Sequence, residues 1–148
     1  MGNADADSFK TNLREGLREL GYVEGQNLAF EFRSAEGKAD QLPKLAAELV
    51  RLKVDLIVAL YVPCALAAKQ ATRDIPIVAI AADPVETGIV TSLARPGGNI
   101  TGVSLMSAAS NAKNIELFHD LLPSVKRVGV LVNAKDPIFA KAMLYRLR

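Results

Sequence analysis

Residues 56–81 read LIVALYVPCALAAKQATRDIPIVAIA, and this stretch decides the fold. Leu56–Leu60 and Ile77–Ala81 are apolar throughout, which is typical of parallel strands that are covered on both faces. Between them, Pro63 suits the first turn of a helix over Ala65–Thr72. The order of strand, helix and strand predicts a βαβ unit, in which two parallel strands are joined by a crossover helix.

The same alternation extends outward in both directions. It predicts an α/β fold, a parallel doubly wound sheet with helices on both faces. Before the central stretch we expect a helix whose apolar face carries Phe9, Leu13, Leu17 and Leu20, a strand over Leu28–Arg33 and a helix that begins at Asp40. After it we expect a short helix from Pro84 to Leu93, a strand over Ile100–Ser104, a helix over Ser107–Leu122, a strand over Arg127–Val132 and a helix over Ile138–Leu147.

Composition excludes several classes of function. The chain has 148 residues, a formal charge of +2, no Trp and a single cysteine, Cys64. Without a dense Lys/Arg stripe or stacking aromatics, nucleic-acid binding is not expected. No apolar run approaches the roughly 18 residues of a membrane span. Met1–Ser8 is small and acidic, unlike a secretory signal peptide.

Several ordered motifs carry a resemblance to a known family. The chain resembles the substrate-binding proteins of bacterial ABC transporters, with the type I periplasmic-binding-protein fold, in the tryptophan/tyrosine-type or uncharacterised subgroup. The resemblance covers about residues 9–137, and its matching stretches are GLRELGYVEG (16–25), LAAELVRLKVD (45–55), ALAAKQAT (65–72), IPIV (75–78), DPV (83–85) and SLARPGGNITG (92–102).

The resemblance implies two α/β lobes that close over a small solute. Residues 1–104 are then an incomplete N-terminal lobe, and residues 105–148 the crossover and the beginning of the second lobe. The family's first strand, which should precede Phe9 and lie between Leu28–Arg33 and Leu56–Leu60, is absent. We therefore expect a chain that is truncated at both ends, while the full-length protein is periplasmic or anchored outside the cytoplasm and delivers its solute to an ABC permease.

Candidate ligand-binding residues follow the strands, because open parallel sheets bind ligands at the carboxyl ends of their strands. Tyr61, Val62, Pro63 and Cys64 lead into a helix whose first N–H groups attract carboxylates. The family often has Gly/Ser-Thr-Pro there, so Tyr61 and Val62 depart from it. We predict that this loop holds the anionic end of an amino-acid-like or aromatic solute. The alternative is an ordinary strand-to-helix connection.

Two further loops could line the same cleft. Asp83 and Pro84 follow the next strand, although Asp83 is equally suited to cap the short helix after it, which is the interpretation we favour. Asn133 would face the cleft from the second lobe, and simple turn chemistry explains it equally well. These residues complete the set of candidate ligand-binding positions.

A rival interpretation is a cytosolic flavodoxin-like α/β enzyme or sensor domain. Against it, the sequence contains no base–nucleophile pair, no metal cluster and no cofactor fingerprint. His119 stands alone without a second metal-ligand residue at a suitable spacing. We accordingly expect no enzymatic activity, no metal and no cofactor. A sheet without its central strand would also expose unpaired backbone edges, through which two copies could form a homodimer.

Overall fold

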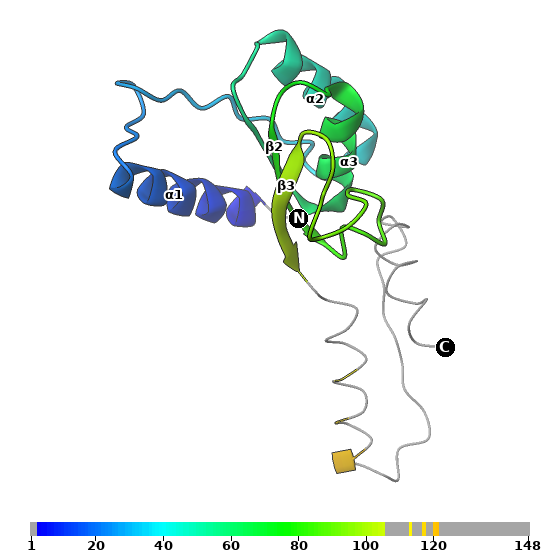
Figure 1. Ribbon diagram of the computed structural model, residues 1–148. Coiled ribbons are helices and arrows are strands. Elements are labelled where there is room, and N and C mark those ends of the chain that lie inside the picture. The colour runs from blue at the N-terminus through cyan, green and yellow to red at the C-terminus, as the bar shows by residue number, and fades with distance from the viewer. Residues whose placement is uncertain (1–2, 106–112, 114–116, 118–119, 122–148) are drawn as a thin grey trace. The chain divides into compact units, whose positions relative to one another are not determined.

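The computed structural model describes residues 3–105, 113, 117 and 120–121 (Figure 1). The chain divides into two compact units, Met1–Val54 and Asp55–Arg148, and each is described by itself. Within the described residues, no helix is long and apolar enough to cross a bilayer. The predicted elements over 127–132 and 138–147, and most of 107–122, lie outside the described residues.

The second unit is built on a parallel sheet. It contains β1 (Ile57–Leu60), α3 (Tyr61–Ala71), β2 (Ile77–Ala82) and β3 (Ile100–Leu105). The strand order is β1-β2-β3, with both pairs parallel and in the register Ile57↔Ile77 and Ile77↔Ile100. The α/β class and the central βαβ unit predicted from residues 56–81 are therefore confirmed.

One face of this sheet forms the core of the unit. Alternate residues of β1 and β2 are buried, and α3 contacts both strands. The buried positions of α3 are Val62, Ala65, Ala67 and Ala68. Because three of these four are alanine, the helix backbone can lie close to the sheet, where small side chains leave room for Ile57 and Ile77. Each fully buried isoleucine stabilises the fold by about 1.5–3 kcal/mol.

The connection from β2 to β3 covers the same face. Parallel crossovers are right-handed, so two crossovers that step in the same direction lie on one face of a sheet. The connection buries Ile89 and Val90, and its Gly88 carbonyl accepts a hydrogen bond from Lys69 Nζ of α3 at 2.7 Å. α3 and this connection thus form one layer over the sheet.

The expected short helix over 84–93 is not present. A single turn takes its place, with Thr87 N–H donating to the Asp83 carbonyl at 3.0 Å and Gly88 N–H to the Val85 carbonyl at 3.1 Å. The turn ends at Gly88, which has a φ of +75°. Glycine adopts this left-handed conformation without steric cost, so it terminates the helical turn after its first bonds.

Polar side chains hold together the edge of the sheet at which the strands begin, its amino-terminal edge. The buried Thr72 hydroxyl accepts hydrogen bonds from the backbone N–H groups of Asp74 and Ile75, each at 3.2 Å. Asn99 Nδ2, just before β3, donates to the Ile75 carbonyl at 2.7 Å. These contacts join the end of α3 and the segment before β2 to the start of β3, so β2 and β3 enter the sheet together.

The first unit contains α1 (Asn3–Glu19), the short 3-10 helix η1 (Ala39–Gln41) and α2 (Leu42–Arg51). The predicted strand over 28–33 is wrong, because this segment makes no ladder and only Leu28 takes part in an isolated bridge, to Glu24. A strand requires a hydrogen-bonded neighbour. Among the described residues, none pairs with residues 29–33, so the segment remains without regular structure.

Side chains attach this segment to α1 instead. Lys10 Nζ lies 3.4 Å from the centroid of the Phe32 ring, and the Arg14 guanidinium lies 5.2 Å from that of Phe30. Lys10 and Arg14 are four residues apart on one face of α1, so both cations meet alternate aromatic rings of the extended segment. The alternation of apolar and polar side chains over residues 28–33 is present, and its aromatic members contact α1.

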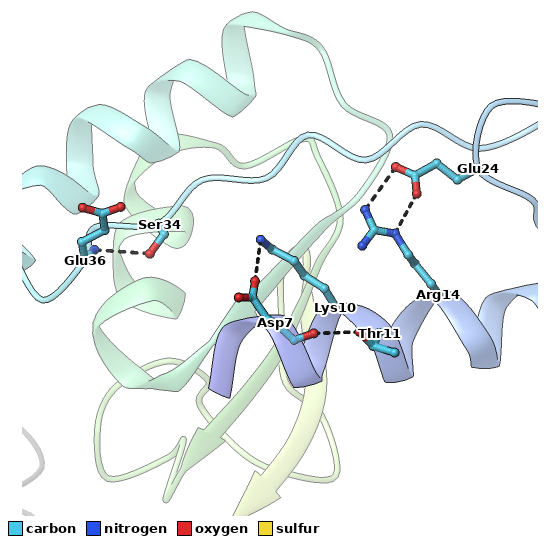
Figure 2. A network of polar contacts seen from close by, with 7 residues as sticks. All are labelled: Asp7, Lys10, Thr11, Arg14, Glu24, Ser34 and Glu36. Carbon is cyan, nitrogen blue, oxygen red and sulfur yellow. Dashed lines mark hydrogen bonds and ion pairs between the residues drawn. The ribbon is translucent and has the colours of Figure 1, made fainter. Parts of the chain in front are cut away.

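Figure 2 shows the ion pairs of Lys10 and Arg14, which accompany this arrangement. Arg14 pairs with Glu24 through two bonds of 2.7 and 3.3 Å, and Lys10 pairs with Asp7 at 3.3 Å. Arg33 joins the segment to α2 through Glu48 at 3.2 Å. The side chains of Arg14 and Glu24 are each 44% exposed and that of Asp7 is 69% exposed, and exposed ion pairs contribute little stability. They orient the elements of this unit more than they hold it together.

Gly102 tests the packing of β3 on β2. It has a φ of +155°, and a Cβ built there would overlap the Ala79 carbonyl oxygen. We expect Gly102→Ala to lower the free energy of unfolding by roughly 1–3 kcal/mol. Gly16→Ala is the control, because nothing lies within 4 Å of its Cβ position and alanine in a helix should stabilise by about 0.5–1 kcal/mol. Urea denaturation measures both; equal effects would contradict the register.

Candidate functional site

The candidate site lies at the carboxyl edge of the sheet. β1 ends at Leu60 and Tyr61 follows it directly, while β2 ends at Ala82 and Asp83 follows it directly. Since β1 and β2 are parallel, the residues that follow them emerge at the same edge. The structure therefore brings the two predicted loops, 61–64 and 83–84, to one edge of the second unit, which is where open parallel sheets bind ligands.

Tyr61 and Asp83 share an unusual backbone conformation. Their φ angles are +68° and +41°, and among the described residues only Glu36 and Lys53 are other non-glycine positions with positive φ. A left-handed backbone costs an L-residue about 1–2 kcal/mol. Such strain persists where surrounding contacts impose it, and it clusters at functional sites. Two strained residues at the ends of neighbouring strands single out this edge.

The start of α3 presents backbone donors at the edge. Its first turn has no side-chain cap, and the first N–H groups of a helix have no partner within the helix. Pro63 has no N–H and the Cys64 N–H makes the first bond within the helix, which leaves the N–H groups of Tyr61 and Val62 at the positive end of the helix dipole. The Val62 side chain is 3% exposed and belongs to the core, whereas Tyr61 is 46% exposed. The loop can therefore contact a solute through Tyr61 and through backbone N–H groups.

The second loop contributes differently. Asp83 is partly exposed, whereas Pro84, the next residue of the connection, is buried. Pro84 therefore shapes the loop, and its side chain does not reach the solvent edge. Asn133, the candidate from the second lobe, lies outside the described residues. Of the predicted residues, Tyr61, Pro63, Cys64 and Asp83 offer partly or fully exposed side chains at one edge.

Cys64 has the character of a packing residue. Burial raises the pKa of its thiol, because desolvation penalises the thiolate. A nucleophilic cysteine requires the opposite shift, which a nearby cation or base provides. In the described part of the chain, no group of three His, Cys, Asp or Glu side chains could hold a metal ion. The described edge thus offers binding groups without an activated nucleophile.

A small hollow nearby does not serve as the site. It lies on the covered face of the sheet beneath the β2–β3 connection, and its lining includes Ala79, Ile89 and Gly102. Its volume of about 70 Å³ is far below the roughly 300 Å³ or more of ligand pockets. The edge itself, which a second protein element could complete, is the better candidate.

Two residues that hold the second loop are not among the predicted ligand-binding positions. The Thr87 hydroxyl donates to the Asp83 carbonyl at 3.0 Å, and Lys69 holds Gly88 in the same turn. The sequence does carry a signal for Thr87. It lies four residues after Asp83, and in a helical turn a hydroxyl at that spacing can donate to the carbonyl of the earlier residue. No sequence signal pairs Lys69 with Gly88, because the two residues are distant along the chain.

Comparison with known proteins gives consistent results. The profile of the family described as ABC transporter substrate binding protein matches residues 4–144. A tyrosine-binding protein from Clostridioides difficile (strain R20291) is 39% identical over 131 residues, which are 88% of this chain and 37% of that protein. The chain thus spans little more than a third of its curated relative.

Solved structures agree with this match. A conserved domain protein from Vibrio cholerae O1 biovar El Tor has a TM-score of 0.80 at 33% identity, over 95% of this chain and 48% of that one. An ABC domain from Streptococcus pneumoniae, solved in complex with L-Trp, has a TM-score of 0.71 at 28% identity, over 92% of this chain and 46% of that one. The chain spans about half the length of these structures.

Tyr61 provides a test of the strained backbone. Its φ of +68° penalises any residue with a Cβ, and glycine removes that penalty. We expect the Tyr61→Gly variant to be more stable than Tyr61→Ala by about 1 kcal/mol, which reverses the usual preference for alanine in helices. Urea denaturation of both variants measures the difference. An alanine variant more stable than the glycine variant would contradict the left-handed conformation.

The pKa of Cys64 predicts slow alkylation. Because burial raises the pKa of this thiol, the folded chain holds a smaller thiolate fraction near neutral pH than the unfolded chain. We expect iodoacetamide to react more slowly with the native chain than with the urea-unfolded chain. The midpoint of its pH–rate profile should lie above the ordinary thiol value of about 8.5. A native thiol that reacts faster would indicate activation.

Proposed function

The chain belongs to the ABC transporter substrate-binding protein family, and from this premise we propose that it forms most of one solute-binding lobe. In this proposal, residues 1–104 belong to the N-terminal lobe and residues 105–148 to the crossover and the start of a second lobe. A small solute binds between the two lobes, and the closed protein delivers it to an ABC permease outside the cytoplasm. Closure of such lobes around a ligand requires no covalent chemistry.

The solute we propose is an aromatic amino acid. Support comes from the similarity to a tyrosine-binding protein and to a domain solved in complex with L-Trp. The chemistry of the described edge suits such a solute. Backbone N–H groups at the start of α3 favour a carboxylate, Asp83 supplies a carboxylate for an ammonium group, and the Tyr61 ring offers an aromatic surface.

One observation carries the assignment of this edge. Tyr61 and Asp83 directly follow two paired parallel strands, and both have positive φ. A chain gains nothing in stability from such strain, so we propose that it serves to present these residues to the solute. The rival interpretation, a flavodoxin-like enzyme or sensor, would use the same edge of the sheet, so binding and turnover measurements separate the two.

Calorimetric titration tests the proposal. Because the solute is proposed to bind between two lobes, the protein should be expressed from its complete reading frame and titrated with L-tyrosine, L-tryptophan and, as a control, L-glutamate. We expect Tyr61→Ala to weaken binding of the aromatic amino acids about tenfold, or about 1.4 kcal/mol. Tyr22→Ala is the matched control, since Tyr22 is 50% exposed and lies in the first unit; it should leave the affinity unchanged.

Two outcomes would contradict the proposal. A protein that binds neither L-tyrosine nor L-tryptophan is not the solute receptor proposed, and turnover of a substrate in parallel hydrolase or reductase assays would favour the rival. Homodimer formation through unpaired sheet edges stays a separate prediction. Light scattering measures it, and a monomeric mass would count against it.

A further inference from the structure

The turn that begins at Asp83 is held by two side chains, those of Thr87 and Lys69. We propose that Thr87 and Lys69 are positioning residues, which hold Asp83 in its left-handed conformation and thereby set the affinity for the solute. This inference rests on the proposed function, since it assigns to Asp83 a contact with an amino-acid solute.

The first step is that Asp83 requires outside support. Its φ of +41° is unfavourable for a residue with a Cβ, although Asp tolerates it better than most. Its own backbone N–H donates to the Leu105 carbonyl at a long distance of 3.4 Å, which is weak for an N–H···O bond. This bond alone holds the Asp83 backbone only loosely. The turn adds contacts to it through Thr87 and Lys69.

Thr87 supplies the contact on the carbonyl side. Both its backbone N–H and its hydroxyl donate to the Asp83 carbonyl, each at 3.0 Å. Two donors on one oxygen fix the plane of the peptide that follows Asp83, and the hydroxyl bond is partly buried. A partly buried carbonyl that loses one donor is less well satisfied, so the hydroxyl contributes more here than on an exposed helix.

Lys69 supplies the contact at the other end of the turn. Its ammonium group reaches from α3 to the Gly88 carbonyl at 2.7 Å. A charged donor makes a stronger hydrogen bond than a neutral one. Because Ile89 immediately after Gly88 is buried at 1% exposure, the turn is fixed at its end by packing as well as by this bond. The turn therefore cannot relax Asp83 by shifting as a whole.

A matched control exists within the same chain. The Thr11 hydroxyl in α1 also donates to the carbonyl four residues earlier, that of Asp7, at 3.0 Å (Figure 2). The geometry of the two bonds is alike, but Thr11 lies on an exposed helix without a residue of positive φ. Loss of the Thr11 hydroxyl consequently removes the same type of bond without affecting Asp83.

The experiment compares Thr87→Val, Thr87→Ser and Thr11→Val in the protein expressed from its complete reading frame. L-tyrosine is the probe for affinity, and the ¹³C chemical shifts of aspartate-labelled protein report the backbone conformation of Asp83. We expect Thr87→Val to shift the Asp83 signals away from left-handed values and to weaken L-tyrosine binding about three- to tenfold. Thr87→Ser should restore both the Asp83 signals and the affinity for L-tyrosine, and Thr11→Val should change neither.

The Lys69 variants test the other end of the turn. Lys69→Met should shift the Asp83 signals and weaken L-tyrosine binding in the same direction as Thr87→Val, and Lys69→Arg should preserve the wild-type values.

The outcomes separate this inference from the proposed function. Unchanged Asp83 signals in both Thr87→Val and Lys69→Met would overturn the inference, as would altered signals with unchanged affinity for L-tyrosine. A wild-type protein that binds no aromatic amino acid would overturn the proposed function. The Asp83 signals would then still decide whether Thr87 and Lys69 hold the turn. Equal loss of affinity in Thr11→Val would show a general loss of stability and contradict a positioning role.

Discussion

The parallel pairing of β1 and β2 is the constraint on which the second unit depends. Four residue pairs, from Ile57↔Ile77 to Leu60↔Ile80, align the strands, and the alanines of α3 allow the crossover helix to approach them closely. This pairing places the ends of both strands at one edge. Without it, Tyr61 and Asp83 would have no common location, and the candidate site would not exist.

The two edges of this sheet have different roles. At the amino-terminal edge, Thr72 and Asn99 satisfy backbone groups through side chains and stabilise the register. At the carboxyl edge, the backbone of Tyr61 and Asp83 is strained, and the first turn of α3 has no side-chain cap. The stabilising contacts thus lie at one edge, and the uncapped helix start and the strained residues lie at the other. This distribution is expected for a binding protein, because groups reserved for a ligand do not stabilise the unliganded fold.

The first unit shows how one sequence pattern can serve two structures. Phe30 and Phe32 alternate with polar residues, a pattern that favours a strand with one buried side. In the described residues they face Lys10 and Arg14 of α1 through cation–π contacts. The alternation is the same in both cases, since an extended chain places every second side chain on one side whether or not a neighbouring strand is present.

The amino-acid sequence by itself determined the parallel α/β class, the βαβ unit of residues 56–81, the two loops at its carboxyl edge and the family. These follow from local patterns: apolar runs, helical spacing and ordered motifs. Only the tertiary structure decided that residues 28–33 form no ladder, that residues 84–88 make one turn in place of a helix, and that Tyr61 and Asp83 are strained. The reason is physical. A ladder needs a neighbour from elsewhere in the chain, and apolar runs and helical spacing carry no information on the φ of a single residue with a Cβ.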